Sequence, residues 1–193
     1  VIAYDLLNEP LPDGPYSIYK QDLVPFYERV TTAIREVDKR HMITVEGANW
    51  TYDFSVFDHL FDDNMFLQFH KYWNRNSREW LDPYLRKRTQ LNVPLWCGET
   101  GENNNLWYSD AIKLLEDHNI GWAFWPWKKL DTTNSCYSIR LPDDWDRLTE
   151  YSSGGAKPSA AMGDQILAEF LDNIRLENCI YAPDVVNALL NGA

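Results

Sequence analysis

The chain has 193 residues and carries 18 Lys and Arg against 29 Asp and Glu, for a formal net charge of −11. A protein with this charge balance repels a polyanion, which argues against a nucleic-acid partner. With 45% hydrophobic and 24% charged residues the chain can bury a sizeable core, which excludes disorder as its main state. No apolar run reaches the roughly 18 residues that a membrane-spanning helix requires, so we expect no membrane partner.

Apolar runs predict five strands, which in chain order are Val1–Leu7, Met42–Val45, Met65–Phe69, Val93–Cys97 and Gly121–Trp125. Helical periodicity predicts helices at about Ile18–Val37, Glu79–Leu91, Asn105–His118, Ser159–Ile174 and Val185–Leu190. Strands that alternate with helices indicate a parallel sheet covered by helices, in one domain. Residues 131–156 are rich in Asp, Ser and Tyr and are predicted to form a long functional or disordered loop. The first strand begins at Val1 with no initiator Met, and from this we expect further sequence upstream.

Aromatic residues make up 15% of the chain, with 9 Trp and 11 Tyr, which is more than one core of this size needs. We therefore expect some of the rings to face a ligand. The three cysteines have no C-x-x-C spacing and the four histidines have no metal-ligand spacing. These spacings predict no metal site. The sequence also lacks G-x-S-x-G, G-x-G-x-x-G and P-loop motifs, so serine-hydrolase, dinucleotide and nucleotide interpretations lack support and we expect no cofactor.

Polar and aromatic side chains follow the predicted strands where each strand ends. They are Asn8-Glu9 after the first strand, His70-Lys71-Tyr72-Trp73 after the third, Glu99-Thr100-Gly101 after the fourth, and Trp125-Pro126-Trp127 at the fifth. In parallel α/β proteins the carboxyl ends of the strands form the ligand-binding face. Strict alternation along the fourth strand predicts that Glu99 shares its inward face with Cys97 and Leu95, and that Trp96 turns toward the helices.

These strand ends together resemble those of glycoside hydrolase family 5, the cellulase-like retaining glycosidases of clan A, which are (β/α)8 barrels. Asn8-Glu9-Pro10 resembles the motif that ends the fourth barrel strand, and His70-Lys71-Tyr72 resembles the H-x-Y of the sixth. Gly98-Glu99-Thr100-Gly101 resembles the motif that ends the seventh strand, and Trp125 the sugar-stacking Trp of the eighth. The resemblance implies an α/β fold, a partial (β/α)8 TIM barrel made of strands four to eight with their helices. Residues 1–193 would then form the C-terminal part of a single catalytic domain whose N-terminal strands are missing.

The resemblance also implies a role for each of these side chains. Glu9 would be the general acid/base and Glu99 the nucleophile, Asn8 would hydrogen-bond the sugar 2-OH, and Tyr72 would orient Glu99. His70 would position the two carboxylates, and Trp125 would form the floor of the subsite for the reacting sugar. Trp50 and Trp127 follow strand ends and are candidate stacking platforms. Retaining hydrolysis requires two carboxyl groups about 5 to 5.5 Å apart.

Each motif also has a purely structural interpretation. Asn-Glu-Pro can be plain capping chemistry, His70 a satisfied core residue, and Trp125 an ordinary strand residue. Glu99 competes with Glu102 for the nucleophile's role, and is preferred because it directly follows the apolar strand. Glu46, at the end of the second strand, is interpreted as a support for its neighbours. The order and spacing of all four motifs together favour the family.

The expected function is a retaining β-glycosidase that hydrolyses a β-linked oligo- or polysaccharide by a two-carboxylate double displacement. Two alternatives stay open: a non-catalytic glycan-binding protein on the same scaffold, and an inactive fragment. Five strands cannot close an eight-stranded barrel, and the Arg and His that family members carry on early strands have no counterpart here. We therefore expect the chain to be inactive or poorly folded without the N-terminal half. The resemblance also implies a secreted or extracytoplasmic location.

Overall fold

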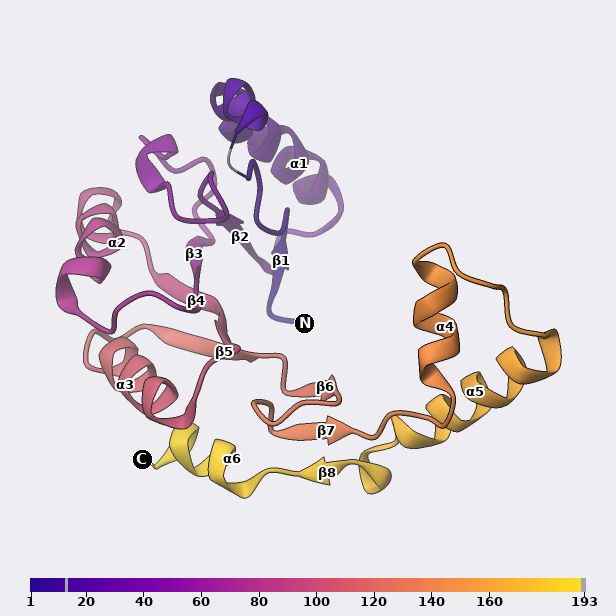
Figure 1. Cartoon of the computed structure of the whole chain (residues 1–193). Coiled ribbons are helices and arrows are strands. Elements are labelled where there is room, and N and C mark those ends of the chain that lie inside the picture. Colours follow the sequence, from indigo (N-terminus) through magenta and orange to yellow (C-terminus); the bar gives the residue numbers. More distant parts are fainter. Residues whose placement is uncertain (13, 192–193) are drawn as a thin grey trace. The chain divides into compact units, whose positions relative to one another are not determined.

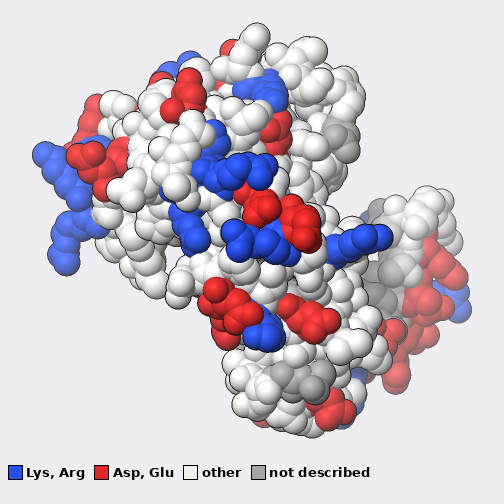
Figure 2. All heavy atoms as spheres, turned by 90° about the vertical axis from the view of Figure 1, so that its left-hand side faces the viewer, with Lys and Arg blue, Asp and Glu red and all other residues white. Residues whose placement is uncertain are grey.

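The computed structural model describes residues 1–12 and 14–191 (Figure 1). These residues divide into two compact units, the first made of residues 1–100 with 110–124, and the second of residues 101–109 with 125–193. Within the described part of the chain, no helix has the length and apolar content needed to cross a membrane. Lys and Arg side chains are interspersed with Asp and Glu on the face shown in Figure 2.

The first unit is built on a five-stranded sheet with the strands in chain order, β1-β2-β3-β4-β5. The strands are β1 (Ala3–Asp5), β2 (Met42–Glu46), β3 (Met65–Lys71), β4 (Leu95–Gly101) and β5 (Gly121–Trp125). β1 pairs with β2, β2 with β3, and β3 with β4, all in parallel. The sheet curls as half of a barrel, which confirms the predicted partial (β/α)8 architecture (Figure 1).

Three of the four connections between these strands contain an α-helix, as the periodicity predicts, and the connection between β2 and β3 contains only a short 3-10 segment. The connections contain η1 (Pro15–Asp22), α1 (Leu23–Val37), η2 (Phe54–Val56), α2 (Arg78–Leu91) and α3 (Asn105–Glu116). The α-helix predicted from Ile18 begins at Leu23, because a 3-10 segment precedes it, and Pro25 is tolerated in its first turn. α2 begins where the Ser77 side chain accepts from Trp80 N, and ends at Asn92, whose left-handed backbone is a common helix terminator.

The hydrophobic core of the first unit lies between one face of the sheet and the helices. It joins strand residues to helix residues, among them Val45, Leu67, Phe69, Leu95 and Cys97 from the sheet and Tyr27, Leu81 and Leu115 from the helices. These strand side chains alternate with polar or partly exposed ones along β2, β3 and β4, as the period of two requires. The opposite, concave face of the same strands is therefore the one left for the functional side chains.

In its described residues, the second unit contains a three-stranded sheet and the helices α4, α5 and α6. Its strands are β6 (Lys128–Leu130), β7 (Tyr137–Ile139) and β8 (Ile180–Tyr181), with β6 and β7 parallel and β7 and β8 antiparallel. Its helices are α4 (Trp145–Ser152), α5 (Ala160–Asn173) and α6 (Pro183–Leu190), with η3 (Leu176–Asn178) between the last two.

The prediction of one long unstructured loop over residues 131–156 was wrong, because this segment contains β7 and α4. β7 has only three residues, and its antiparallel partner β8 lies more than 40 residues further along the chain. A strand this short has no readable alternation and forms only when its partners are in place. α4 has eight residues, which is too short for a clear helical period.

Candidate active site

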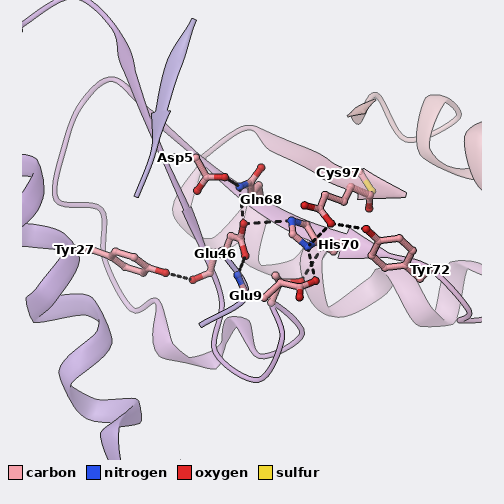
Figure 3. A network of polar contacts seen from close by, with 10 residues as sticks. Asp5, Glu9, Tyr27, Glu46, Gln68, His70, Tyr72 and Cys97 are labelled. Atoms are coloured by element: carbon pink, nitrogen blue, oxygen red, sulfur yellow. Dashed lines mark hydrogen bonds and ion pairs between the residues drawn. The ribbon is translucent and has the colours of Figure 1, made fainter. Parts of the chain in front are cut away.

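Polar side chains from four successive strand ends meet on the concave side of the first unit (Figure 3). Glu9 follows β1, Glu46 is the last residue of β2, His70 lies near the end of β3, and Glu99 lies in β4. Tyr72 directly follows β3 and contacts Glu99. The structure therefore brings together four of the predicted site residues, Glu9, His70, Tyr72 and Glu99, together with Glu46.

A β-bulge places Glu99 on this face. Phe69 is paired with Cys97, whereas the next residue, His70, is paired with Glu99, so Gly98 is an extra residue in β4. The prediction that Glu99 shares its face with Cys97 was wrong, because the alternation is interrupted at Gly98. Cys97 is fully buried in the core shared with the helices, and Trp96 is paired with Gln68 on the concave face.

The imidazole of His70 lies between three carboxylates. Its Nδ1 is 2.8 Å from Oε1 of Glu9 and 3.5 Å from Oε2 of Glu99, and its Nε2 is 3.3 Å from Oε1 of Glu46. The side chain of His70 is 2% exposed, whereas those of Glu9 and Glu99 are 24% and 19% exposed. Solvent and ligands can therefore reach the two glutamates but not the ring that joins them.

The carboxylates around His70 determine its charge. Burial of the ring disfavours protonation, but the hydrogen bonds and charges of Glu46, Glu9 and Glu99 outweigh it and raise the pKa of His70 to about 9. The imidazole is therefore a cation at neutral pH, and both of its nitrogens donate. Carboxylate oxygens of Glu9 and Glu99 lie within 4.8 Å of each other, near enough to share this cation.

The same three side chains, Glu9, His70 and Glu99, are near enough to one another to bind a metal ion. The ring nitrogen that faces the two glutamates, Nδ1 of His70, already lies at hydrogen-bond distance from Oε1 of Glu9, 2.8 Å away. We therefore interpret the cluster as a hydrogen-bonded acid network rather than a metal centre.

A second row of polar groups supports the first. The buried carboxylate of Glu46 accepts a hydrogen bond from the backbone N–H of Glu9 at 2.6 Å and one from Nε2 of Gln68 at 2.8 Å. Gln68 also donates to Asp5, and the hydroxyl of Tyr27 donates to the backbone oxygen of Glu46 at 3.0 Å. These contacts agree with the supporting interpretation of Glu46. Gln68 was missed, although an amide within an otherwise apolar strand is the signal that could have indicated it.

The remaining predicted site residues lie at exposed positions. Asn8 precedes Glu9 in an exposed bend, and Trp50 follows β2 in a turn, 45% exposed, with a left-handed backbone (φ 56°). Trp125 and Trp127 belong to the second unit and are 52% and 51% exposed. Trp127 packs edge-on against Tyr137, with ring centroids 5.3 Å apart. All three indoles are therefore accessible for stacking, each within its own unit.

A curled parallel sheet that gathers two glutamates, a histidine and a tyrosine at the carboxyl ends of its strands belongs to the class of (β/α)8-barrel enzymes, which place their active sites at this end. The cellulase model, which describes glycosyl hydrolase family 5, matches residues 1–131. The chain belongs to this family, which confirms the resemblance found in the sequence.

Individual relatives match parts of the chain. Endoglucanase C of Acetivibrio thermocellus is 38% identical over 61 residues, which are 28% of this chain and 18% of that protein. An endoglycoceramidase of Cyanea nozakii is 25% identical over 166 residues, which are 73% of this chain and 31% of that protein. The matched regions therefore span less than a third of these curated relatives.

Solved structures share the fold. Endoglucanase Cel5A from Thermotoga maritima matches with a TM-score of 0.55 at 16% identity, over 90% of this chain and 59% of that one. The cellulose synthase subunit Z of Clostridioides difficile matches with a TM-score of 0.59 at 17% identity, over 98% of this chain and 61% of that one. The chain thus spans about three fifths of each of these two structures.

Proposed function

We propose that this chain carries the catalytic pair of a retaining glycoside hydrolase, and that the pair cleaves O-glycosidic bonds in a β-linked oligo- or polysaccharide. The observation that supports this most directly is the pair itself. Glu9 and Glu99 are 90 residues apart in sequence, yet their carboxylate oxygens approach within 4.8 Å around the buried His70. Retaining enzymes hold their carboxyl groups about 5 to 5.5 Å apart, whereas inverting enzymes leave about 6.5 to 9.5 Å for a water molecule.

In this proposal Glu99 attacks the anomeric carbon while Glu9 protonates the leaving glycosidic oxygen. The sugar is then covalently bound to Glu99, and Glu9 takes a proton from the water that releases it. The hydroxyl of Tyr72 donates to Oε2 of Glu99, which holds that oxygen in one orientation. Nδ1 of His70 lies 2.8 Å from Oε1 of Glu9 and 3.5 Å from Oε2 of Glu99, so the ring holds both carboxyl groups in place.

The substrate class is proposed from chemistry and from relatives. Exposed indole faces complement the C–H faces of pyranose rings, and we assign stacking to Trp50, Trp125 and Trp127. Asn8 is assigned the hydrogen bond to the sugar 2-OH. Solved neighbours include Thermotoga maritima Cel5A in complexes with cellobiose and with mannotriose, and the mannohexaose complex of a Thermomonospora fusca β-mannanase. Glucans and mannans are therefore the first substrates to test, and polymers of this kind imply a location outside the cytoplasm.

We further propose that residues 1–193 are the C-terminal part of one catalytic domain, and that activity requires the remaining strands of the barrel. Five strands do not close an eight-stranded barrel, and β1 lies at the edge of the sheet. The concave face near the amino ends of the strands holds an apolar cavity of about 410 Å³, lined by residues that include Met42, Phe66 and Trp96. A closed barrel would cover these side chains.

The test uses the chain in a closed barrel, with the missing strands supplied by its own upstream coding sequence or by a homologous family 5 enzyme. We expect hydrolysis of aryl β-glycosides and of cello- or manno-oligosaccharides, with the β-anomer formed first. Glu99→Gln should abolish turnover, whereas Glu102→Gln, at a carboxylate paired with Lys129 at 2.7 Å, should retain it.

An α-anomeric first product, or equal activity of the Glu99→Gln variant, would overturn the proposal. Binding of oligosaccharides without hydrolysis, unaffected by Glu99→Gln, would favour the alternative of a non-catalytic glycan-binding protein. The isolated chain, assayed in parallel, is expected to be inactive.

A further inference from the structure

Glu46 is a fully buried carboxylate that does not belong to the catalytic pair. Its side chain is 0% exposed, and removing a carboxylate from water is costly unless hydrogen bonds and an opposite charge compensate. Here the compensation comes from the amide of Gln68, the backbone N–H of Glu9 and the ring of His70. Two of these three partners, Glu9 and His70, are parts of the proposed active site.

We infer that Glu46 is a positioning residue, which fixes the backbone of Glu9 and holds His70 as the cation that joins the two catalytic glutamates. This inference rests on the proposed function, because it assigns Glu46 a role in the same reaction. It also goes beyond that function, because Glu46 is closed to solvent and contacts His70 at Nε2, whereas the two catalytic glutamates contact Nδ1 (Figure 3).

The first part of the role concerns the backbone. Glu9 has a φ of 43°, in the left-handed region that residues with a Cβ rarely adopt. Its N–H donates to Oε2 of Glu46 at 2.6 Å, a charge-assisted hydrogen bond that favours this conformation. The backbone conformation of Glu9 sets the direction of its side chain toward His70. Glu46 therefore positions the acid/base through its hydrogen bond to the Glu9 backbone.

The second part concerns charge. The ionisable groups that face His70 are Glu9 from the segment after β1, Glu46 from β2, and Glu99 from β4, with Asp5 of β1 linked through Gln68. Among the ionisable groups of the described residues, Glu46 alone contacts Nε2, while the other two glutamates share Nδ1. Loss of the Glu46 charge removes the Nε2 partner and lowers the affinity of the ring for its second proton.

Two further ionisable groups, Tyr27 and Asp5, lie near Glu46. The hydroxyl of Tyr27, from α1, donates to the backbone oxygen of Glu46 and leaves its carboxylate untouched. The Asp5 carboxyl has a raised pKa, because the surrounding protein partly desolvates it and because the Glu46 charge lies near it. Tyr27 therefore offers a matched control that perturbs the same strand end without changing the Glu46 charge.

The experiment is a histidine titration by two-dimensional NMR, combined with kinetics in the closed-barrel protein. The chain has four histidines, so the resonance of His70 can be assigned by its absence in His70→Gln. We expect a midpoint for His70 near 9 in the native protein, and a midpoint at least one pH unit lower in Glu46→Gln. In Glu46→Gln we also expect kcat to be reduced about 10- to 100-fold, with KM changed less than threefold.

The controls separate positioning from stability. Tyr27→Phe should lower Tm and leave the His70 midpoint in place, and Glu36→Gln, on the exposed surface, should change neither. Glu46→Asp keeps the charge, so its His70 midpoint should lie above that of Glu46→Gln. It is also the variant to titrate if Glu46→Gln folds poorly. A native midpoint near 6.5, or a Glu46→Gln variant that loses only stability, would overturn the inference. An inactive native protein with the expected titration would instead reject the proposed function alone.

Discussion

His70 of β3 is paired with Glu99 of β4, although the preceding residue, Phe69, is paired with Cys97. The extra residue between Cys97 and Glu99 is Gly98, and it moves Glu99 from the helix-facing side of the sheet to the concave side. A bulge of this kind redirects one side chain without disturbing the rest of the strand. The contact between Glu99 and His70 therefore depends on one glycine.

Gly98→Ala tests this dependence. A Cβ built on Gly98 would lie 2.1 Å from Oε1 of Gln68, whose amide is held by Asp5 and Glu46. Because Gln68 cannot move without breaking these bonds, we expect a loss of about 1 to 3 kcal/mol in the free energy of unfolding. We also expect kcat to fall, as measured on the closed-barrel protein.

Gly163→Ala is the matched control. Gly163 lies within α5, and a Cβ there meets nothing within 4 Å outside its own helix. Alanine is favoured over glycine in helices by about 1 kcal/mol, so this variant should be as stable as the native protein or more so. Equal stability of both alanine variants in urea unfolding would argue against a steric requirement at Gly98.

Tyr72→Phe removes the hydroxyl that donates to Oε2 of Glu99. A hydrogen bond to a charged group contributes about 1.5 to 3 kcal/mol, which corresponds to a roughly 10- to 100-fold change in rate when it acts in the transition state. We expect kcat to fall by about this factor, with little change in KM. Tyr16→Phe, at an exposed position in η1, should have native kinetics, and a Tyr72→Phe variant with native kcat would remove Tyr72 from the mechanism.

The charge on His70 also predicts how stability depends on pH. Its folded pKa is raised from 6.5 to about 9, so between these values the native state binds more protons than the unfolded state. The resulting stabilisation is complete below pH 6.5 and is lost as the pH rises through 9, by on the order of 3 kcal/mol.

This contribution is measured as the difference between the urea unfolding free energies of the native protein and of His70→Gln, from pH 6 to pH 9.5. His118→Gln is the control, because Nδ1 of His118 lies 2.8 Å from the carbonyl oxygen of Leu114 rather than beside a carboxylate. A difference between the native protein and His70→Gln that stays constant over this pH range would show that the three carboxylates do not hold a proton on the ring.

Much of the first unit is predictable from the sequence because its signals are local. Apolar runs such as Met65–Phe69 mark the strands of the sheet, and parallel strands bring their carboxyl ends to one edge. That is enough to predict Glu9, His70, Tyr72 and Glu99 as neighbours. The orientation of Glu99 is not local, because a bulge depends on how β4 pairs with β3.

The second unit depends on contacts between distant residues. β7 pairs with β8, and Lys128 of β6 donates to the backbone oxygen of Ile174, which follows α5. No periodicity within residues 131–156 indicates either partner. The hydrogen bond between Gln68 and Glu46 also depends on residues that are distant in sequence. Glu46 ends one strand and Gln68 lies in the next, and the two side chains become a pair only when the sheet forms.

The last prediction concerns Lys71, a buried residue that directly follows His70 in β3. Its side chain is fully buried on the side of β3 away from His70, where Nζ donates to the backbone oxygens of Asn74 and Arg75 and lies 4.2 Å from the ring centroid of Trp80. Burial lowers the pKa of Lys71 from 10.5 to about 8.

Between pH 8 and 10.5 the unfolded chain therefore binds more protons at Lys71 than the native state does, and this group makes stability rise with pH. We expect the native protein to gain on the order of 3 kcal/mol relative to Lys71→Met across this window, measured as the difference between their urea unfolding free energies. The comparison cancels the titration of groups common to both proteins. Lys39→Met, at an exposed position, should show no such gain. If the native protein instead loses stability relative to Lys71→Met as the pH rises, the ammonium is favoured by its carbonyl and indole contacts more than burial disfavours it.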